Sequence, residues 1–259
     1  MIAEAIKAEI VTRLRRAEEE HRVKILFAIE SGSRAWGFAS PNSDYDVRFI
    51  YAHEPMWYQS IDLEERRDVI EYPIIDDIDL NGWDMRKALR LFWNSNPTFV
   101  EWIQSPITYS ECGAFRPLAV QALPQIYSAA KGIYHYRSMA RTNYRGHFRE
   151  STVRLKKYFY VLRPLLAAMW IEKTGKAAPI EFQKLLPLIA DQPLLLDAVH
   201  ALLEQKINSP ELGLAPAVPV LNAFIEDALE KEPAFASKHE RDAADIRLLN
   251  AIFQRILYE

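Results

Sequence analysis

The sequence contains only one cysteine, Cys112, in 259 residues. A lone cysteine cannot form an internal disulfide, and no second cysteine is present to complete a zinc site or a redox pair. We therefore expect the protein in a reducing compartment, the cytoplasm. We interpret Cys112 itself as a small buried hydrophobic residue, which is the usual environment of a free cysteine.

The sequence also lacks long apolar runs and an excess of either charge. Its longest apolar run, 165–171, lies between Arg163 and Glu172 and is far shorter than the roughly 18 residues that a membrane-spanning helix needs. The first 23 residues carry charges every few positions, so we expect neither a signal peptide nor a membrane partner. With 32 basic and 35 acidic residues the formal net charge is −3, so any basic binding site must be local.

The residues best suited to chemistry are concentrated in the stretch 27–51, FAIESGSRAWGFASPNSDYDVRFIY. Two strand-like runs, 24–29 and 45–51, flank a connection that contains Gly32 and Ser33. Glycine permits a positive φ and close backbone approach, and a strand that leads through Gly-Ser into a short helix points backbone N–H groups at an anion. This connection is therefore suited to hold a phosphate group.

Asp44 and Asp46 give the same stretch a pair of carboxylates. Because side chains alternate along a strand, these two point to one face while Val47 and Phe49 point to the other, where they can be buried. Two adjacent carboxylates repel each other unless a cation lies between them. Hard oxygen ligands on a rigid strand suit Mg²⁺, which binds one or two carboxylates together with substrate phosphates. The plain alternative is a hairpin loop with an Asn/Ser/Asp turn.

The order Gly-Ser, ten further residues, then Asp-x-Asp followed by apolar residues resembles the signature of the DNA polymerase β-like nucleotidyltransferase superfamily. Within it, the later stretch 78–109, IDLNGWDMRKALRLFWNSNPTFVEWIQSPITY, is similar to predicted nucleotidyltransferases associated with RNA repair and RNA ligase genes. The resemblance covers about residues 20–170. It implies transfer of a nucleoside monophosphate from a triphosphate such as ATP to an acceptor hydroxyl, with release of pyrophosphate.

The resemblance also implies a third carboxylate, on a strand beside the one that bears the pair. Asp79 stands at the matching position, on the polar face of the strand-like run 78–83. Asp77 and Asp84 are the alternatives. Asp84 is better placed to cap the helix predicted to begin just after it.

From residue 111 onward the sequence shows no glycine-rich loop and no recurring strand pattern. Helical periodicity recurs instead, and we expect helices at 115–127, 129–150, 152–173, 180–189, 193–206, 216–230 and 242–257. Together with the resemblance, this pattern predicts an α/β (α+β) nucleotidyltransferase domain with a mixed sheet, residues 1–108. An all-helical domain for substrate and nucleotide binding, residues 109–259, would follow it.

Basic residues gather in one part of the predicted helical half. Nine basic residues and one acidic residue lie between Lys131 and Arg163, a local charge of +8. Four of them recur at every fourth position and would form a stripe along a helix: Arg137, Arg141, Arg145 and Arg149. Like charges at this spacing destabilise a helix unless an anion is near. The stripe is either a solvated, acid-paired face or a wall of the active-site cleft that faces phosphates.

Together with the resemblance, these residues define the predicted site. Metal ligation and catalysis are assigned to Asp44, Asp46 and Asp79, with two Mg²⁺ ions or with Mn²⁺ in their place. Nucleotide binding is assigned to the turn and to nearby hydroxyl and basic groups: Gly32, Ser33, Ser43, Arg141, Arg145 and Lys156. The acceptor is open among an RNA end, a tRNA, a protein side chain and a small molecule. A catalytically silent nucleotide-binding protein and an antitoxin-like interaction protein of the same fold are the alternatives.

Overall fold

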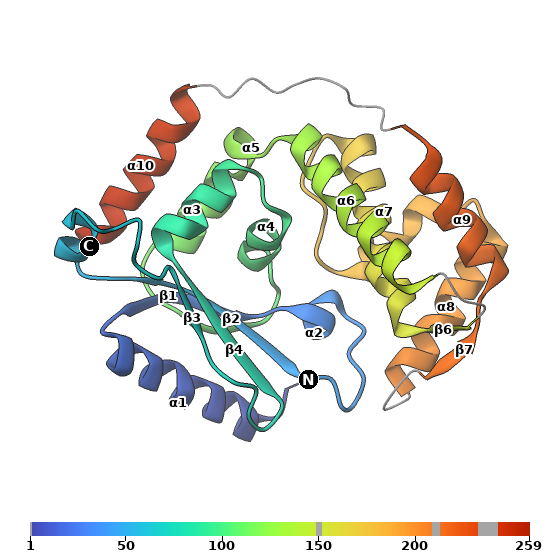
Figure 1. Ribbon diagram of the computed structural model, residues 1–259, viewed down its shortest axis with the longest axis horizontal. Helices are drawn as coiled ribbons and strands as arrows, with labels where there is room; N and C mark the ends of the chain where they lie inside the picture. The colour runs from blue at the N-terminus through green and yellow to red at the C-terminus, as the bar shows by residue number, and fades with distance from the viewer. Residues whose placement is uncertain (1, 149–151, 209–212, 233–242) are drawn as a thin grey trace. The chain divides into compact units, whose positions relative to one another are not determined.

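The computed structural model describes residues 2–148, 152–208, 213–232 and 243–259 (Figure 1). The chain divides into two compact units. The first contains Met1–Ala35, Asp44–Ile126 and Arg241–Glu259, and the second contains Trp36–Ser43 and Tyr127–Glu240. Among the described residues, no helix is long and apolar enough to cross a membrane.

A five-stranded sheet forms the centre of the first unit, in the order β3-β4-β2-β1-β5. Its strands are β1 (Lys24–Glu30), β2 (Tyr45–Ala52), β3 (Val69–Glu71), β4 (Ile78–Asp84) and β5 (Thr108–Glu111). β2 and β4 run parallel, and the other neighbouring pairs are antiparallel. The predicted mixed sheet is therefore confirmed.

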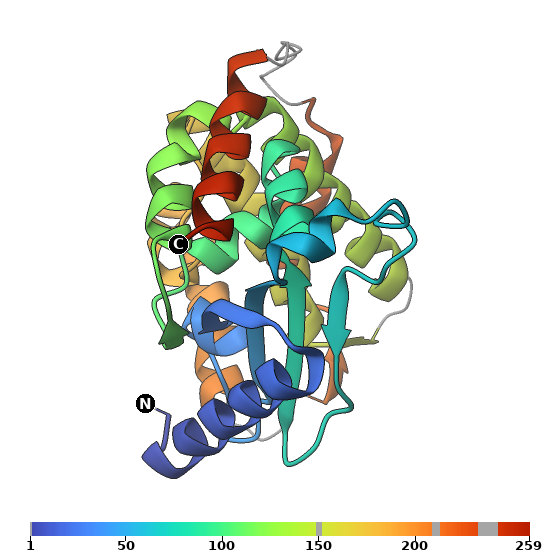
Figure 2. The ribbon, with the colours of Figure 1, turned by 90° about the vertical axis from the view of Figure 1, so that its left-hand side faces the viewer.

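Helix α1 (Glu4–His21) covers one face of this sheet (Figure 2). Its buried Ile10 and Leu14 share a core with Val47 and Phe49 of β2. The alternation predicted for β2 is therefore confirmed, and its polar side chains lie on the opposite face. The other helices of this part of the chain are α2 (Gly32–Trp36), α3 (Met85–Trp93), α4 (Pro97–Ile103), α5 (Phe115–Ile126) and α10 (Ala243–Leu257).

The second unit is mainly helical; the sequence predicted an all-helical domain, and the exception is a small two-stranded sheet. Its helices are α6 (Ala129–His147), α7 (Lys156–Thr174), α8 (Pro193–Asn208) and α9 (Pro219–Glu230). Almost every apolar side chain of α7 is buried, so this helix forms the centre of the core. Burial on all sides explains why α7 is apolar around its whole circumference.

Two helices predicted for this unit are corrected by the structure. The helix expected at 152–173 begins only at Lys156, because β6 (Thr152–Arg154) pairs with β7 (Leu214–Pro216) in a small antiparallel sheet. The helix expected at 180–189 is a pair of 3₁₀ turns, Phe182–Lys184 and Leu186–Ile189. Pro187 lies between them and lacks the N–H that a continuous α-helix would need.

The division between the units differs from the boundary predicted at residue 108. β5 pairs with β1, and α5 contacts the same strand. α10 contacts α3 and α5. These segments join the first unit through contacts that are distant in sequence, which local periodicity does not reveal. Cys112, which follows the edge strand β5, is exposed, so its interpretation as a buried residue is wrong.

Asp84 joins the sheet to α3. It ends β4 and is almost fully buried, and its carboxylate accepts a hydrogen bond of 2.7 Å from the Arg86 backbone N–H, so it caps α3 as predicted. It also accepts a hydrogen bond of 2.7 Å from the Tyr58 hydroxyl. Burial raises the pKa of Asp84 to about 6, from 3.8 for an unperturbed aspartate, although these hydrogen bonds oppose the rise.

We expect the stability of the wild-type protein, relative to Asp84→Asn, to fall as the pH rises through about 6. The folded state binds the Asp84 proton more tightly than the unfolded state, so this stabilisation is complete below the unfolded pKa of 3.8 and is lost above about 6. The change is at most about 3 kcal/mol, and asparagine keeps the helix cap. Urea unfolding at several pH values between about 4 and 7 measures it. A stability difference that does not change with pH would contradict the prediction.

Candidate active site

The glycine-serine turn places its backbone directly against Asp46. Gly32 follows β1, begins α2 and has a φ of +57°. A Cβ atom here would lie 1.9 Å from Oδ2 of Asp46, so a larger residue fits only if that carboxylate moves. The backbone N–H of Ser31 also donates to the Asp46 carbonyl at 2.8 Å. The conformation of the turn and the position of the carboxylate therefore depend on each other.

Asp46 and Asp79 lie side by side on neighbouring strands. They are register partners in the parallel pair β2–β4, with their side chains on the same face. Both are partly buried, with side-chain exposures of 30% for Asp46 and 20% for Asp79. Burial raises the pKa of Asp46, the charges of Asp79 and Asp44 raise it further, and the charge of Arg48 opposes them. The protein therefore concentrates negative charge in a poorly solvated position.

The register separates Asp79 from the other candidates for the third carboxylate. Asp77 lies in the exposed turn before β4, with a φ of +59°, and Asp84 caps α3. Asp44 is exposed and immediately precedes β2, close enough for its charge to act on Asp46. The structure thus sets Asp79 beside Asp46, and neither alternative takes that position.

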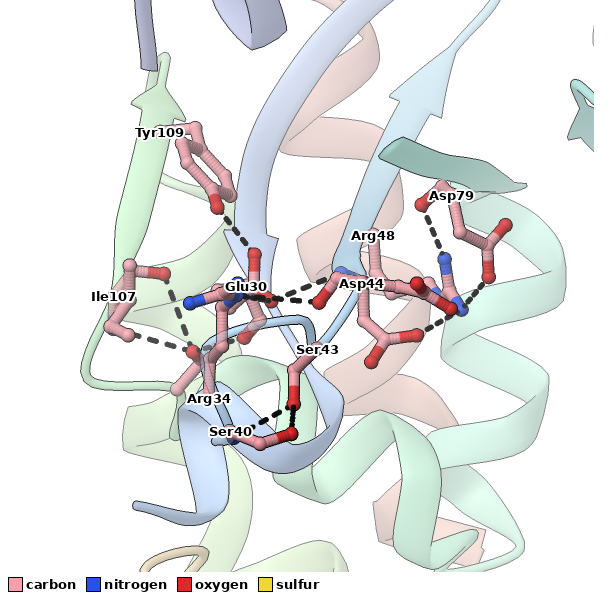
Figure 3. Close-up of polar contacts among 11 residues, drawn as sticks. Glu30, Arg34, Ser40, Ser43, Asp44, Arg48, Asp79, Ile107 and Tyr109 are labelled. Atoms are coloured by element: carbon pink, nitrogen blue, oxygen red, sulfur yellow. Dashed lines mark hydrogen bonds and ion pairs between the residues drawn. The ribbon is translucent and has the colours of Figure 1, made fainter. Parts of the chain in front are cut away.

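Arg48, which the sequence pattern did not single out, lies between the carboxylates of Asp46 and Asp79. Figure 3 shows its contact with Asp79. Its Nη2 atom is 2.6 Å from Oδ2 of Asp79 and 3.2 Å from Oδ1 of Asp46. Its Nη1 atom donates to the backbone carbonyls of Asp79 at 2.8 Å and Val47 at 3.0 Å. Strand alternation was the available signal, because a residue two positions after Asp46 shares its face.

A further buried carboxylate, Glu30, supports the site from the end of β1. Its Oε1 accepts a hydrogen bond of 3.0 Å from the Asp46 backbone N–H, and its Oε2 accepts one from the Tyr109 hydroxyl of β5 (Figure 3). Arg34 Nε lies 4.0 Å from Oε1. Burial raises the pKa of Glu30 to about 7, while the hydrogen bonds from Tyr109 and Asp46 oppose this rise. Glu30 therefore fixes the backbone that carries Asp46.

The donor set fits a divalent cation in its chemistry. Asp46 and Asp79 offer hard oxygen ligands, and their burial and mutual repulsion favour a cation between them. In this structure the Arg48 guanidinium lies in that position. In the part of the chain that the structure describes, no group of three or more His, Cys, Asp or Glu side chains is arranged to hold a metal ion.

The two serines predicted to bind nucleotide have different surroundings. Ser33 lies in α2 and is partly exposed, and its hydroxyl has no hydrogen-bond partner among the described residues. The Ser43 hydroxyl accepts a hydrogen bond of 2.9 Å from the Ser40 backbone N–H and lies 3.0 Å from the Ser40 hydroxyl. Lys206 Nζ donates to that same Ser40 hydroxyl at 2.7 Å. Ser43 thus stabilises the loop before Asp44.

Part of the basic stripe has a structural role in the second unit. Arg137 is buried and donates to the backbone carbonyls of Leu229, at 3.3 Å, and Lys231. Arg141 donates to the same Leu229 carbonyl at 3.3 Å. These carbonyls lie at the C-terminal end of α9, where helices leave carbonyls unpaired and favour cations. Arg149 lies outside the described residues.

Arg141 and Arg145 also border a surface hollow of about 400 Å³ beside α9. Its remaining lining consists of Tyr144, Glu226, Leu229 and Glu230. The two glutamates offset much of the positive charge there. Lys156 begins α7 and does not line this hollow. The structure therefore groups two of the three basic residues predicted to bind nucleotide.

Comparison with known protein families decides how this fold is classified. The RNA repair pathway DNA polymerase beta family matches the sequence over residues 6–255. The chain belongs to this family. Membership confirms the resemblance drawn from the Gly-Ser and Asp-x-Asp motifs, and the match includes both units. The family indicates a polymerase β-like nucleotidyltransferase, a class that generally uses divalent metal ions.

Two similar proteins extend this comparison. Uncharacterized protein YcgL from Bacillus subtilis (strain 168) is 42% identical over 241 residues, which are 93% of this chain and 92% of that protein. The crystal structure of a nucleotidyltransferase-like protein from Exiguobacterium sibiricum 255-15 matches 92% of this chain and 73% of that chain. Its sequence identity is 14% and its TM-score is 0.32. Because 93% of this chain aligns with YcgL, that similarity includes nearly all of the residues that match the family, 6–255.

We expect Gly32→Ala to destabilise the protein more than Gly37→Ala, its matched control. Both glycines have positive φ, +57° and +88°, so alanine is strained at either position by about 1–2 kcal/mol. Only at Gly32 would the added methyl group meet Asp46, because nothing lies within 4 Å of the corresponding position at Gly37. Urea unfolding should therefore show a larger loss of stability for Gly32→Ala. Equal losses would show that the contact with Asp46 has no energetic consequence.

Proposed function

We propose that this protein transfers a nucleoside monophosphate from a nucleoside triphosphate to a terminal hydroxyl of RNA and releases pyrophosphate. The observation that carries this proposal is the register of β2 with β4, which sets Asp46 beside Asp79 and against the Gly32 turn. A pair of carboxylates next to a turn suited to phosphate fits a reaction in which the charge of the transferred group must be balanced by cations.

Each group of the site has a role in this reaction. The acceptor oxygen forms a bond to the α-phosphorus while the bond from that phosphorus to its β-bridging oxygen breaks, so pyrophosphate leaves. Divalent ions held by Asp44, Asp46 and Asp79 would neutralise charge on the attacking and leaving oxygens. Asp79 receives the proton of the acceptor hydroxyl. Gly32 and Ser33 hold the β- and γ-phosphates.

A cationic cluster in the second unit supports RNA as the acceptor. The cluster consists of four cations, none of which has an acidic partner among the described residues: Arg154, Lys156, Lys157 and Lys206. Burial lowers the pKa of Lys157 and of Lys206, and the charge of Lys156 lowers both further. Lys157 Nζ also lies 5.0 Å from the ring centroid of Tyr160, which is 39% exposed. Cations beside an aromatic ring suit single-stranded RNA, through phosphate contacts and base stacking.

The reaction can be tested with purified protein, an RNA oligonucleotide, each α-labelled nucleoside triphosphate in turn, and Mg²⁺ or Mn²⁺. We expect label to enter the RNA and pyrophosphate to be released, and a blocked 3′ hydroxyl to prevent both. Transfer to tRNA, protein or a small molecule in a cell extract, with none to the oligonucleotide, would replace RNA ends as the acceptor. Triphosphate binding without any transfer would indicate a catalytically silent family member.

We expect Asp46→Asn and Asp79→Asn to lower the transfer rate by about 1000-fold, because each variant loses a charged oxygen ligand at the reacting phosphate. Asp77→Asn is the matched control, since its side chain lies in the exposed turn before β4, and it should keep the wild-type rate. Initial rates and melting temperatures of the three variants separate lost chemistry from lost folding. Wild-type transfer by Asp79→Asn would contradict the assigned site.

We expect Lys156→Gln and Arg154→Gln, two members of the cationic cluster, to weaken RNA binding without loss of stability. Each removed phosphate contact should reduce the slope of log affinity against log salt by about 0.7 for a single strand. Arg137→Gln is the matched control, because this buried arginine caps α9 and should affect stability while the salt slope stays unchanged. Fluorescence anisotropy at several salt concentrations measures the slopes. An unchanged slope in both test variants would remove these residues from the RNA-binding surface.

A further inference from the structure

Arg48 is held much more firmly than an ordinary surface arginine. Its guanidinium contacts the carboxylates of Asp46 and Asp79 and two backbone carbonyls, and only 17% of its side chain is exposed. A planar guanidinium with several charge-assisted contacts loses little freedom per hydrogen bond and keeps one orientation. The protein therefore contains a fixed positive charge in the middle of its acidic site.

The carboxylate oxygens around this charge are already engaged. Arg48 takes Oδ2 of Asp79 and Oδ1 of Asp46, and Asn81 Nδ2 donates to Oδ1 of Asp79 at 2.5 Å. Oδ2 of Asp46 lies against the Gly32 turn. A divalent ion such as Mg²⁺ binds carboxylate oxygens at about 2.1 Å, and a second cation on the same oxygens is repelled. Arg48 and a divalent ion therefore compete for the same oxygens.

We propose that Arg48 is an internal counter-ion of the metal site, which keeps Asp46 and Asp79 together in the metal-free protein and must be displaced when a divalent ion binds. This inference rests on the proposed function, because it takes these carboxylates as the metal ligands. In the metal-free protein, Arg48 offsets the repulsion between the paired aspartates, so the site stays assembled. When an ion binds, breaking the contacts of Arg48 opposes binding and lowers the affinity for a free ion.

The test compares wild-type protein with Arg48→Met, which keeps much of the side-chain length and removes the charge. Mn²⁺ binding without nucleotide is followed by electron paramagnetic resonance. We expect Arg48→Met to bind Mn²⁺ about tenfold more tightly or better. Its melting temperature should be lower than that of the wild type without metal, because the two carboxylates lose their cation, and should rise more when Mn²⁺ is added.

Arg13→Met is the matched control. Arg13 also bridges two carboxylates and a backbone carbonyl, with contacts of 2.7 Å to Glu9, 2.6 Å to Asp76 and 2.8 Å to the Ile75 carbonyl. These partners lie in α1 and in the turn before β4 and include none of the assigned metal ligands. Its loss should leave Mn²⁺ affinity unchanged. A second variant, Arg48→Lys, keeps the charge and should bind Mn²⁺ nearly as weakly as the wild type.

Several results would overturn the inference. If folded Arg48→Met binds Mn²⁺ with wild-type or weaker affinity, Arg48 does not compete with the ion. If Arg48→Met does not fold, Arg48→Gln takes its place and must show the same gain in affinity. Asp46→Asn in each background separates this failure from failure of the proposed function. If Asp46→Asn does not change Mn²⁺ binding, the assigned metal site itself is wrong. If Mn²⁺ binding depends on Asp46 but has the same affinity in wild type and Arg48→Met, only the role of Arg48 is refuted.

Discussion

The parallel pairing of β2 with β4 is the constraint on which the candidate site depends. It sets the Asp46 carboxylate beside that of Asp79 on a face where neither is fully solvated. Such an arrangement is unfavourable by itself, because burial and like charge both oppose ionisation. The burial of Val47 and Phe49 against α1, on the other face of the sheet, offsets this unfavourable energy. The hydrophobic face therefore holds the acidic face in register.

The groups around these carboxylates balance their charge and hold them in position. Arg48 supplies positive charge from the same strand face, and Gly32 leaves room for the carboxylate of Asp46 where a side chain would collide with it. Glu30 holds the Asp46 backbone from β1 and is held in turn by Tyr109 of β5. Three strands thus contribute to the position of one carboxylate. β5 belongs to the sheet through its pairing with β1, although most of this strand lies beyond the predicted domain boundary at residue 108.

The cations of the second unit show how one sequence pattern can combine different roles. The four-residue spacing placed the arginines of α6 on one side of the helix, but their partners differ. Arg137 and Arg141 bind the carbonyls at the end of α9, whereas Arg145 borders the hollow beside that helix. Lys156 belongs to another group, which surrounds the start of α7 and has no acidic partner among the described residues. Periodicity identifies a shared face and leaves open what that face meets.

The sequence by itself determined the features that arise between residues close along the chain. Strand alternation at Asp46 and Val47, the positive φ at Gly32, the cap at Asp84 and most helices follow from local sterics and hydrogen bonding. Only the tertiary structure set Asp79 beside Asp46, with Arg48 between them, and joined β5 and α10 to the first unit. These outcomes depend on pairing and packing between distant segments. Which strands become neighbours is fixed by the burial of the whole core, which no local pattern contains.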